Sequence, residues 1–409
     1  MCIRDSLRGT GSLAPVEHRH REWYLDLAER AAVGLDGGEE GRWVARVDRD
    51  LDNLRAAHGS AVRAGDLAVA TRLVAALSEY CFRRVRYEIA SWGEATMQME
   101  DFASSPSAPV VVAVAAYGRW VRGDLADAIE LAHRSLGLTD ELGVPSTGLA
   151  ERVLGNALFY SGETQEALAW MQRMVALAEE SGSPAALTHA LYMASVAATS
   201  TAEPARGATL AEQATAAADR CGSPTACAQA AYATGLARRA TDNQHAERIL
   251  RRAAHLGDEA GNRWIRGFAF TEVAWLAAQQ GRVAEGLRGF AEVIDLWYRG
   301  GDWANQWLSM RHVLGILTDL GAHQAAAVLH GALEASGAAA ALPFEPGDAE
   351  QLAAEANRAR RVLGDAEFAM AVRRGAAMSD ADTVAYVRAQ IDRLLDEQGT
   401  DRAPPTVTP

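Results

Sequence analysis

The most constraining feature of this chain is a periodicity of 39 or 40 residues. Small residues recur at this interval at Ala128, Ala167, Gly207, Ala246, Gly286 and Ala326. A turn-like residue lies five positions before each of them, and a second series with the same spacing comprises Gly143, Gly182, Gly222, Gly261 and Gly301. Two interleaved series with one period indicate a single supersecondary unit repeated about six times, which is typical of a solenoid.

The composition favours an array of helices. Apolar residues make up 49% of the chain and aromatic residues only 7%. Alanine, the best helix former, dominates the apolar set. A repeat array grows by stacking units rather than by enlarging one core, so 409 residues do not require several independent domains. We therefore predict an all-α fold, an α-solenoid superhelix of stacked helical hairpins.

Residues 106–336 are expected to form about six hairpins. Each first helix should end near Gly123, Gly162, Ala202, Asp242, Gly281 or Gly321. The glycines of the second series should end the second helices in the left-handed conformation, which costs little only for glycine. The residues that follow supply N-caps (Ser183, Ser223, Asn262 and Asp302) and prolines for the first helical position (Pro145, Pro184 and Pro224).

Residues 17–105 are expected to form an N-terminal helical block. Its first helix should run from Glu17 to about Ala32, a second should begin near Glu39, and Asp66 should cap a third. A fourth helix should carry Ile89, Trp92, Met97 and Phe102. Residues 1–16 show no helical period. We expect them to be disordered or non-native, with the natural protein extending further upstream.

Residues 337–398 are expected to form a small C-terminal helical cap. After a linker that ends at Pro346, helices are predicted at 348–363 and 365–376, and Ser379 should cap the last helix. Residues 399–409 contain Pro404 and Pro405 and are expected to form a disordered tail.

Charge and residue types exclude several functional classes. The net charge of −13 disfavours direct binding of nucleic acid. All 40 basic residues are arginine, and the lack of lysine excludes a P-loop, a protein kinase and Schiff-base chemistry. No run of about 20 apolar residues could span a membrane, and no segment has the pattern of a signal peptide. We therefore expect a cytoplasmic location and no membrane partner.

No residue pattern predicts a catalytic or metal site. Cys221 and Cys227 have no further ligands nearby, and His18 and His20 point in different directions on a helix because they lie two residues apart. Acidic pairs in the chain are interpreted as solvated helix ends and surfaces. We predict no catalytic residue, no metal, no cofactor and no enzymatic activity.

The hairpin pattern resembles tetratricopeptide repeats, with a turn glycine followed five residues later by a small residue. It departs from them in period, because the usual unit has about 34 residues. The chain also resembles the C-terminal helical region of LuxR-type transcriptional regulators and other bacterial STAND signal-transduction ATPases.

Three stretches carry the second resemblance. They are HRHREWYLDLAE at His18–Glu29, DLDNLRAA at Asp50–Ala57, and the closing helices at Glu350–Met378. In such regulators a switch domain hydrolyses ATP, a separate domain reads promoters, and the repeat region senses an inducer or partner. This chain matches neither of the first two parts, so the resemblance implies the sensor portion alone.

The aromatic residues supply the candidate binding site. Five of the ten tryptophans lie between Trp264 and Trp307, and two pairs within this set, Trp264 with Trp275 and Trp303 with Trp307, are spaced to share a helix face. They either fill the core between the last hairpins or line a groove as binding anchors. The resemblance to tetratricopeptide arrays implies that Tyr117, Asn156 and Trp275, each six residues before a turn glycine, face the groove. The candidate ligand-binding residues are Trp275, Tyr117, Asn156, Trp264, Trp303 and Trp307.

The leading hypothesis is a non-enzymatic sensing module of a bacterial regulator, which binds a protein or peptide partner or a small-molecule inducer. A second hypothesis is a stand-alone adaptor that binds a protein or peptide. A third, more remote one is a helical-toroid hydrolase that uses acidic pairs. The sequence alone identifies neither the ligand nor the oligomeric state.

Overall fold

The computed structural model describes residues 13–200, 203–336 and 348–400, and these residues form helices and no strand. None of the described helices is long and apolar enough to cross a membrane. The α-helices follow in this order: α2 (Leu13–Gly34), α3 (Glu40–Ala64), α4 (Leu67–Ala76), α5 (Ser78–Arg84), α6 (Glu88–Thr96), α7 (Ala108–Val121), α8 (Leu125–Leu142), α9 (Leu149–Tyr160), α10 (Thr164–Ser181), α11 (Pro184–Thr199), α12 (Pro204–Cys221), α13 (Pro224–Arg238), α14 (Asn243–Glu259), α15 (Arg263–Gln279), α16 (Val283–Gly300), α17 (Trp303–Asp319), α18 (His323–Ala335), α20 (Asp348–Leu363), α21 (Asp365–Ala376) and α22 (Asp380–Thr400).

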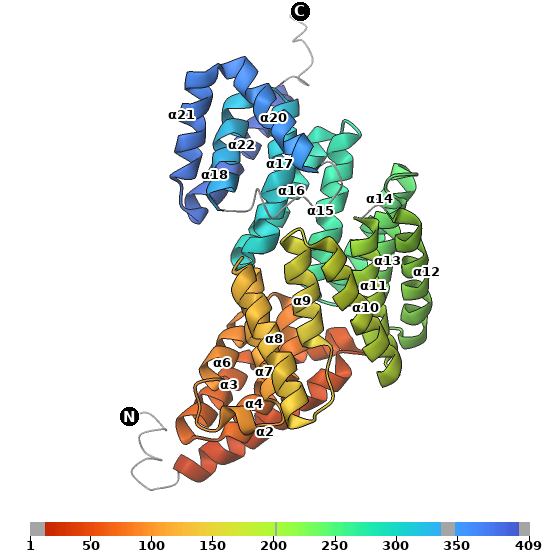
Figure 1. Ribbon diagram of the computed structural model, residues 1–409, viewed down its shortest axis with the longest axis vertical. Coiled ribbons are helices and arrows are strands. Elements are labelled where there is room, and N and C mark those ends of the chain that lie inside the picture. Colours follow the sequence, from red (N-terminus) through yellow and green to blue (C-terminus); the bar gives the residue numbers. More distant parts are fainter. Residues whose placement is uncertain (1–12, 201–202, 337–347, 401–409) are drawn as a thin grey trace, which may run out of the picture.

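Helices α7 to α18 form six antiparallel hairpins that stack in chain order, as Figure 1 shows from the orange helices through yellow, green and cyan to blue. Each helix packs against the next one along the chain, and first helices of neighbouring hairpins, such as α7 with α9 and α11 with α13, also pack together. This arrangement confirms the predicted all-α solenoid of helical hairpins. Contacts between successive units rather than one central core hold such an array together.

The repeated small residues lie where two helices approach closely. All six positions are buried, and those in α8, α10 and α14 (Ala128, Ala167 and Ala246) have no exposed surface. A Cβ atom at Gly286 would lie 2.8 Å from the carbonyl oxygen of Ala274, so the backbones of α15 and α16 could not keep their present separation around a larger residue. The period of the sequence thus marks the helix contacts within each hairpin.

The predicted junctions are confirmed except at Pro145. The five glycines of the second series have φ between 62° and 73°, in the left-handed region. Each predicted N-cap side chain accepts a hydrogen bond from the amide three residues later; for example, Asn262 accepts from Ile265 at 3.1 Å. Pro184 and Pro224 begin their helices, whereas Pro145 precedes α9 by four residues because Gly148, with φ of 77°, delays the helix start. The turn predicted at Ala202 lies outside the described residues.

The N-terminal helices differ from expectation at three places. Helix α2 begins at Leu13 rather than Glu17, because Pro15 falls in the first turn, where its missing amide costs nothing. The predicted fourth helix ends at Thr96, and Phe102 instead begins a separate 3-10 turn. The short helix α5 was not predicted; it is ended by Val85, whose φ of 56° is uncommon for a β-branched residue. The N-cap predicted at Asp66 is confirmed, because its carboxylate accepts from the amide of Val69.

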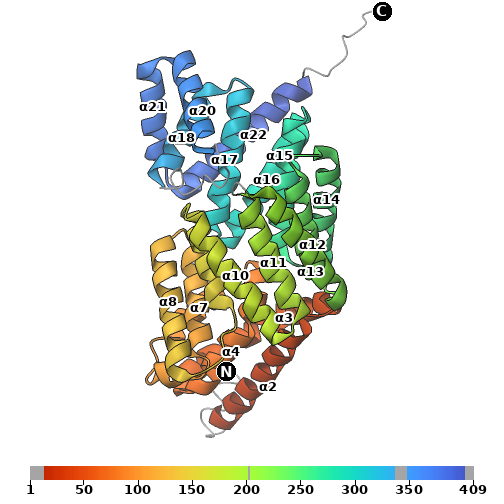
Figure 2. The same ribbon diagram turned by 45° about the vertical axis from the view of Figure 1, so that its right-hand side comes forward.

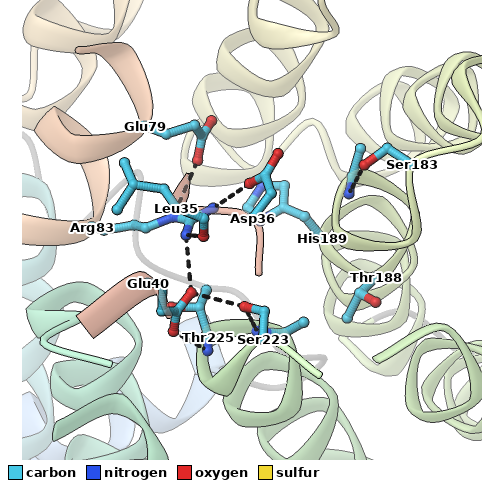
Figure 3. A network of polar contacts seen from close by, with 12 residues as sticks. Leu35, Asp36, Glu40, Glu79, Arg83, Ser183, Thr188, His189, Ser223 and Thr225 are labelled. Atoms are coloured by element: carbon cyan, nitrogen blue, oxygen red, sulfur yellow. Dashed lines mark hydrogen bonds and ion pairs between the residues drawn. The ribbon is translucent and has the colours of Figure 1, made fainter. Parts of the chain in front are cut away.

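The N-terminal helices also bind hairpins far along the chain. The carboxylate of Glu40, at the start of α3, accepts from the hydroxyl of Ser223 at 2.8 Å and from the amide of Thr225 at 2.5 Å (Figure 3). The start of α3 accordingly lies beside the lower end of α13 in Figure 2. A second contact joins α5 to the next junction, where Arg84 donates to the carbonyl of Gly261 at 2.7 Å.

The last junction of the array is held in the same way. The hydroxyl of Tyr87 donates to Asp302 at 2.7 Å. The N-terminal helices therefore contact three consecutive hairpin junctions, at Ser223, Gly261 and Asp302, which fixes the curvature of the stack.

The array curves until its last hairpin meets its first. Helix α17 packs against α7, and the hydroxyl of Tyr160 at the end of α9 donates to the side chain of Asn305 in α17. The hairpins stack one after another, as predicted, but the stack bends into a nearly closed turn.

The C-terminal helices cover the last hairpin (Figure 1, top, blue). Helix α21 packs on α18 and α22 on α16. The bounds of α20 and α21 match the predicted ones, and the hydroxyl of Ser379 caps α22 through the amide of Asp382 at 3.2 Å. Helix α22 continues to Thr400, beyond the predicted start of the tail at Gly399; the predicted linker and the remainder of the tail lie outside the described residues.

Candidate functional site

The first helices of hairpins two to six share one cavity. The residue six positions before each hairpin turn recurs at the repeat spacing, and in α9, α11, α13, α15 and α17 this residue lines the cavity, as Asn156, Val196, Leu236, Trp275 and Gly315 respectively. Five successive helices therefore present one equivalent position to a common space, which identifies this side as the inner face of the curved stack. We call this space the groove cavity.

Aromatic side chains form the wall of the groove cavity. Tyr192 lies edge-on to Tyr232 at a centroid distance of 5.8 Å and to Trp264 at 6.2 Å, and Phe268 packs on Trp264 at 4.5 Å. Together with Met171 and Met193 they provide an apolar surface with directional ring contacts. The cavity volume is about 170 Å³.

Charged residues at the groove cavity are held in ion pairs. Arg239 binds Glu272 at 2.7 Å, and its guanidinium lies 4.8 Å from the ring centroid of Trp275, an arrangement that holds the indole in place. Arg311 binds Glu355 at 3.0 Å. Burial, and then the neighbouring Arg311 and Arg239, lower the pKa of His312 to about 3, so this imidazole is neutral at physiological pH.

Two hydrogen-bond donors in the wall of the groove cavity have no partner among the described residues. They are Nδ2 of Asn156 and Nε1 of Trp264, and both side chains are buried, with 2% and 1% exposure. A buried donor without an acceptor costs about 1–3 kcal/mol, and most such groups in folded proteins are satisfied. Acceptor groups of a bound molecule would satisfy both.

Three of the six candidate residues lie outside the groove cavity. Tyr117 in α7 is buried against Phe82 and Trp120, at centroid distances of 4.9 and 5.4 Å. The rings of Trp303 and Trp307 are tilted against each other at a centroid distance of 6.2 Å, and both side chains pack in the apolar cluster between the last hairpins and the C-terminal helices. The cavity thus brings together Asn156, Trp264 and Trp275 from the sequence-based set.

Several further residues line the groove cavity, and the repeat register contains a signal for them. Tyr192, Tyr232 and Arg311 lie one helical turn before the residues already aligned on the turns, and they recur with the same spacing. Residues four apart share a helix face, so a second row on each first helix could have been predicted. His312 has no such signal.

A second cavity, of about 390 Å³, lies where the first turns of α9, α11 and α13 meet the N-terminal helices, and charged side chains such as Glu79, Arg83 and Arg152 contribute to its lining. Its charged side chains form ion pairs. Arg152 binds Glu79 at 2.5 Å. Arg83 binds Asp36 at 3.0 Å (Figure 3). Burial, and then Arg152, lower the pKa of His189 to about 3. We call this space the polar cavity.

Phe82 of α5 separates the two cavities. Its ring packs on Trp264 of the groove cavity at 4.4 Å, and the Arg152 guanidinium of the polar cavity lies 4.3 Å from its centroid. Because Phe82 also contacts Tyr117, the N-terminal helices cover the inner face of the first hairpin. This explains why the groove position of that hairpin does not line the cavity.

Among the described residues, no group of three or more His, Cys, Asp or Glu side chains could hold a metal ion. Cys81, Cys221 and Cys227 are free thiols.

Comparison with known proteins supports the fold and indicates a distant relationship to regulators. No family model matches the chain. Three curated proteins, one from Mycobacterium bovis and two from strains of Mycobacterium tuberculosis, are each 28% identical to it over 184 residues, or 45% of its length. They are provisionally named HTH-type transcriptional regulators, and the matched stretch spans only 17% of their length.

Among solved structures, a Rap protein complexed with competence and sporulation factor superimposes with a TM-score of 0.57 at 12% identity. The superposition covers 92% of this chain and 99% of that one. At this identity the match shows a shared helical-repeat fold.

Proposed function

We propose that this chain is the non-enzymatic sensing portion of a bacterial transcriptional regulator of the LuxR or STAND type, and that the groove cavity is its ligand site. The observation that carries the proposal is the convergence of five successive hairpins on one aromatic space, in which Asn156 and Trp264 have donors without a partner in the described part of the chain. The weak similarity to proteins named as regulators supports the same reading.

The size and charge of the groove cavity limit its ligand. Its volume of about 170 Å³ is smaller than the roughly 300–1,000 Å³ typical of sites that enclose a whole drug-sized molecule. It suits one or two side chains of a bound peptide, or a small inducer. Glu272 and Arg311 are already paired, so the ligand is expected to contact the wall through apolar groups and hydrogen-bond acceptors rather than a net charge.

Binding would act on the curvature of the stack. A ligand that contacts several first helices favours the arrangement in which they lie at the right separation, and shifts the population towards it. A neighbouring switch domain could respond to that change. A ligand present at 100 times its Kd would stabilise the folded chain by about 2.7 kcal/mol, which is readily measured as a rise in Tm.

The paired acids also support a non-enzymatic role. Glu272 is bound to Arg239, and Asp319 is bound to Arg358 at 3.2 Å, so neither is a free general base. The neutral His312 stacks on Phe290 at 5.8 Å.

The test is a thermal-shift screen of a metabolite library and a library of short peptides, repeated on two tryptophan variants. In Trp275→Ala the indole below Arg239 is lost from the cavity. In the matched control, Trp170→Ala, an indole below Arg173 is lost from the outer helix α10, where the guanidinium lies 5.7 Å from the ring centroid. We expect a hit whose shift disappears in Trp275→Ala and in Asn156→Leu and persists in the control.

The class of hit decides between the hypotheses. A metabolite would support an inducer sensor, whereas a peptide alone would support the stand-alone adaptor. Hits that bind both tryptophan variants equally would contradict the groove cavity as the site. Turnover of a hit that is abolished by Glu272→Gln would contradict the non-enzymatic assignment and favour the hydrolase hypothesis.

A further inference from the structure

A third cavity, of about 310 Å³, lies where three distant segments meet and shares no residue with the groove cavity. The loop between α5 and α6 contributes Val85 and Arg86, the start of α15 contributes Arg263 and Arg266, and the end of α16 contributes Arg299. Glu292 and Asp295 also line it. We call this space the arginine cleft.

The arginine cleft contains two arginines whose side chains have no hydrogen-bonded or ion-paired partner among the described residues. Neither Arg86 nor Arg263 makes a side-chain hydrogen bond or ion pair with any residue that the structure describes, and both are exposed. The two acids of the cleft are already engaged. Glu292 pairs with Arg266. Asp295 pairs with Arg388 at 3.0 Å and also lies 3.9 Å from Arg299. This local excess of positive charge stands out in a chain of net charge −13.

The cations of the cleft repel one another. Desolvation within the cleft, and then the neighbouring Arg84 and Arg86, lower the pKa of the Arg263 guanidinium, against a smaller opposing effect of Asp48. Arg84 is held nearby by its bonds to Asp48 at 2.7 Å and to the carbonyl of Gly261. The fold therefore keeps several guanidiniums together at an electrostatic cost.

The backbone beside Arg86 is held in an uncommon conformation. Val85 has φ of 56°, in the left-handed region that a β-branched residue rarely adopts. Its side chain packs against Gly300, where a Cβ atom would collide with it. The strained loop is thus fixed against the end of α16, next to Arg299.

We propose that the arginine cleft binds a doubly charged phosphoryl oxyanion, carried by a small molecule or present as free phosphate. Two unmatched guanidiniums supply the charge that such a group requires, and arginine binds phosphate through paired N–H donors. Because Arg86 belongs to the N-terminal helices and Arg263 to the hairpin array, the bound anion bridges these two parts of the molecule and strengthens their contact. This site is independent of the groove cavity.

The test compares the full chain with two charge-matched double variants. Arg86→Gln with Arg263→Gln removes the two unmatched cations of the cleft. Arg288→Gln with Arg361→Gln removes two exposed arginines elsewhere that likewise make no ion pair with described residues. Isothermal titration and thermal shift are measured with inorganic phosphate, pyrophosphate and citrate, at an ionic strength held constant with sodium chloride. Circular dichroism without ligand checks that each variant is folded.

We expect phosphate or pyrophosphate to bind the wild type and the control variant with equal affinity, and the cleft variant at least tenfold more weakly. Stronger binding of pyrophosphate than of phosphate would identify a phosphorylated small molecule as the better ligand, and equal binding would identify free phosphate. The proposal is overturned if the cleft variant binds as well as the control, if chloride alone reproduces the shift, or if citrate binds and neither phosphate compound does.

Discussion

Replacing Glu40 with alanine should loosen the N-terminal helices from the hairpin array. The Glu40 side chain has no exposed surface, and its carboxylate accepts bonds from Ser223, from the amide of Thr225 and from Arg83, the last at 3.1 Å. Removal would leave buried donors without an acceptor and the Arg83 guanidinium, whose side chain is only 8% exposed, without one of its partners.

The expected loss is about 3–5 kcal/mol, the range for breaking a buried ion pair by removing one partner. This is a large share of the 5–15 kcal/mol that typically stabilises a folded domain. Glu39→Ala is the matched control, because the neighbouring Glu39 side chain is 71% exposed and forms an ion pair with the exposed Arg42. That change should stay within about 0.5 kcal/mol.

The assay is urea unfolding followed by circular dichroism and tryptophan fluorescence, with a double-mutant cycle between Glu40→Ala and Ser223→Ala. We expect a coupling energy of about 1 kcal/mol or more, since the two side chains share one hydrogen bond. A loss below 1 kcal/mol for Glu40→Ala, together with no coupling, would refute the docking of α3 on α13.

Three further changes test packing and protonation. Gly375→Ala should lower the free energy of unfolding by about 1–3 kcal/mol in urea, because a methyl group there would collide with the carbonyl of Val328. Gly137→Ala in α8, where there is open space, should raise it by up to about 1 kcal/mol. Equal effects would contradict the close contact of α18 with α21. Ala167→Leu should lower the free energy of unfolding by about 1–3 kcal/mol by overpacking α9 against α10, and a neutral result would contradict that role. Burial lowers the pKa of His58 to about 4, so between pH 4 and 6.5 the folded state binds fewer protons than the unfolded one. The free energy of unfolding is therefore highest above pH 6.5 and should fall by about 3 kcal/mol as the pH is lowered from 6.5 towards 4. The free energy of unfolding of His58→Gln, measured across the same pH range, should not show this decrease.

Local rules were sufficient to predict the hairpins. The glycine series, the four N-caps and the two prolines at Pro184 and Pro224 act within one helix turn, so their effect can be read without knowing the fold. The predictions failed where a glycine or a tertiary contact overrode the local pattern. Gly148 delays α9 beyond Pro145, and Val85 ends α5 in a conformation that no propensity suggests.

The site was predictable only as far as the repeat register extends. Asn156 and Trp275 were placed on the groove because equivalent positions face the same side of each first helix. The covering of Tyr117 by Phe82 could not be predicted, because it depends on how the N-terminal helices return to the array. The arginine cleft joins residues more than 170 positions apart in sequence, and no spacing indicates it.

The contact between α7 and α17 limits how this protein can vary in length. Open solenoids gain and lose units by duplication, because each unit touches only its neighbours. Here an inserted or deleted hairpin would place a different helix opposite α7 and pull Asn305 away from Tyr160. The copy number of the repeats is therefore locked by geometry, and divergence among relatives with this closure is expected through substitution and loop changes rather than through added units.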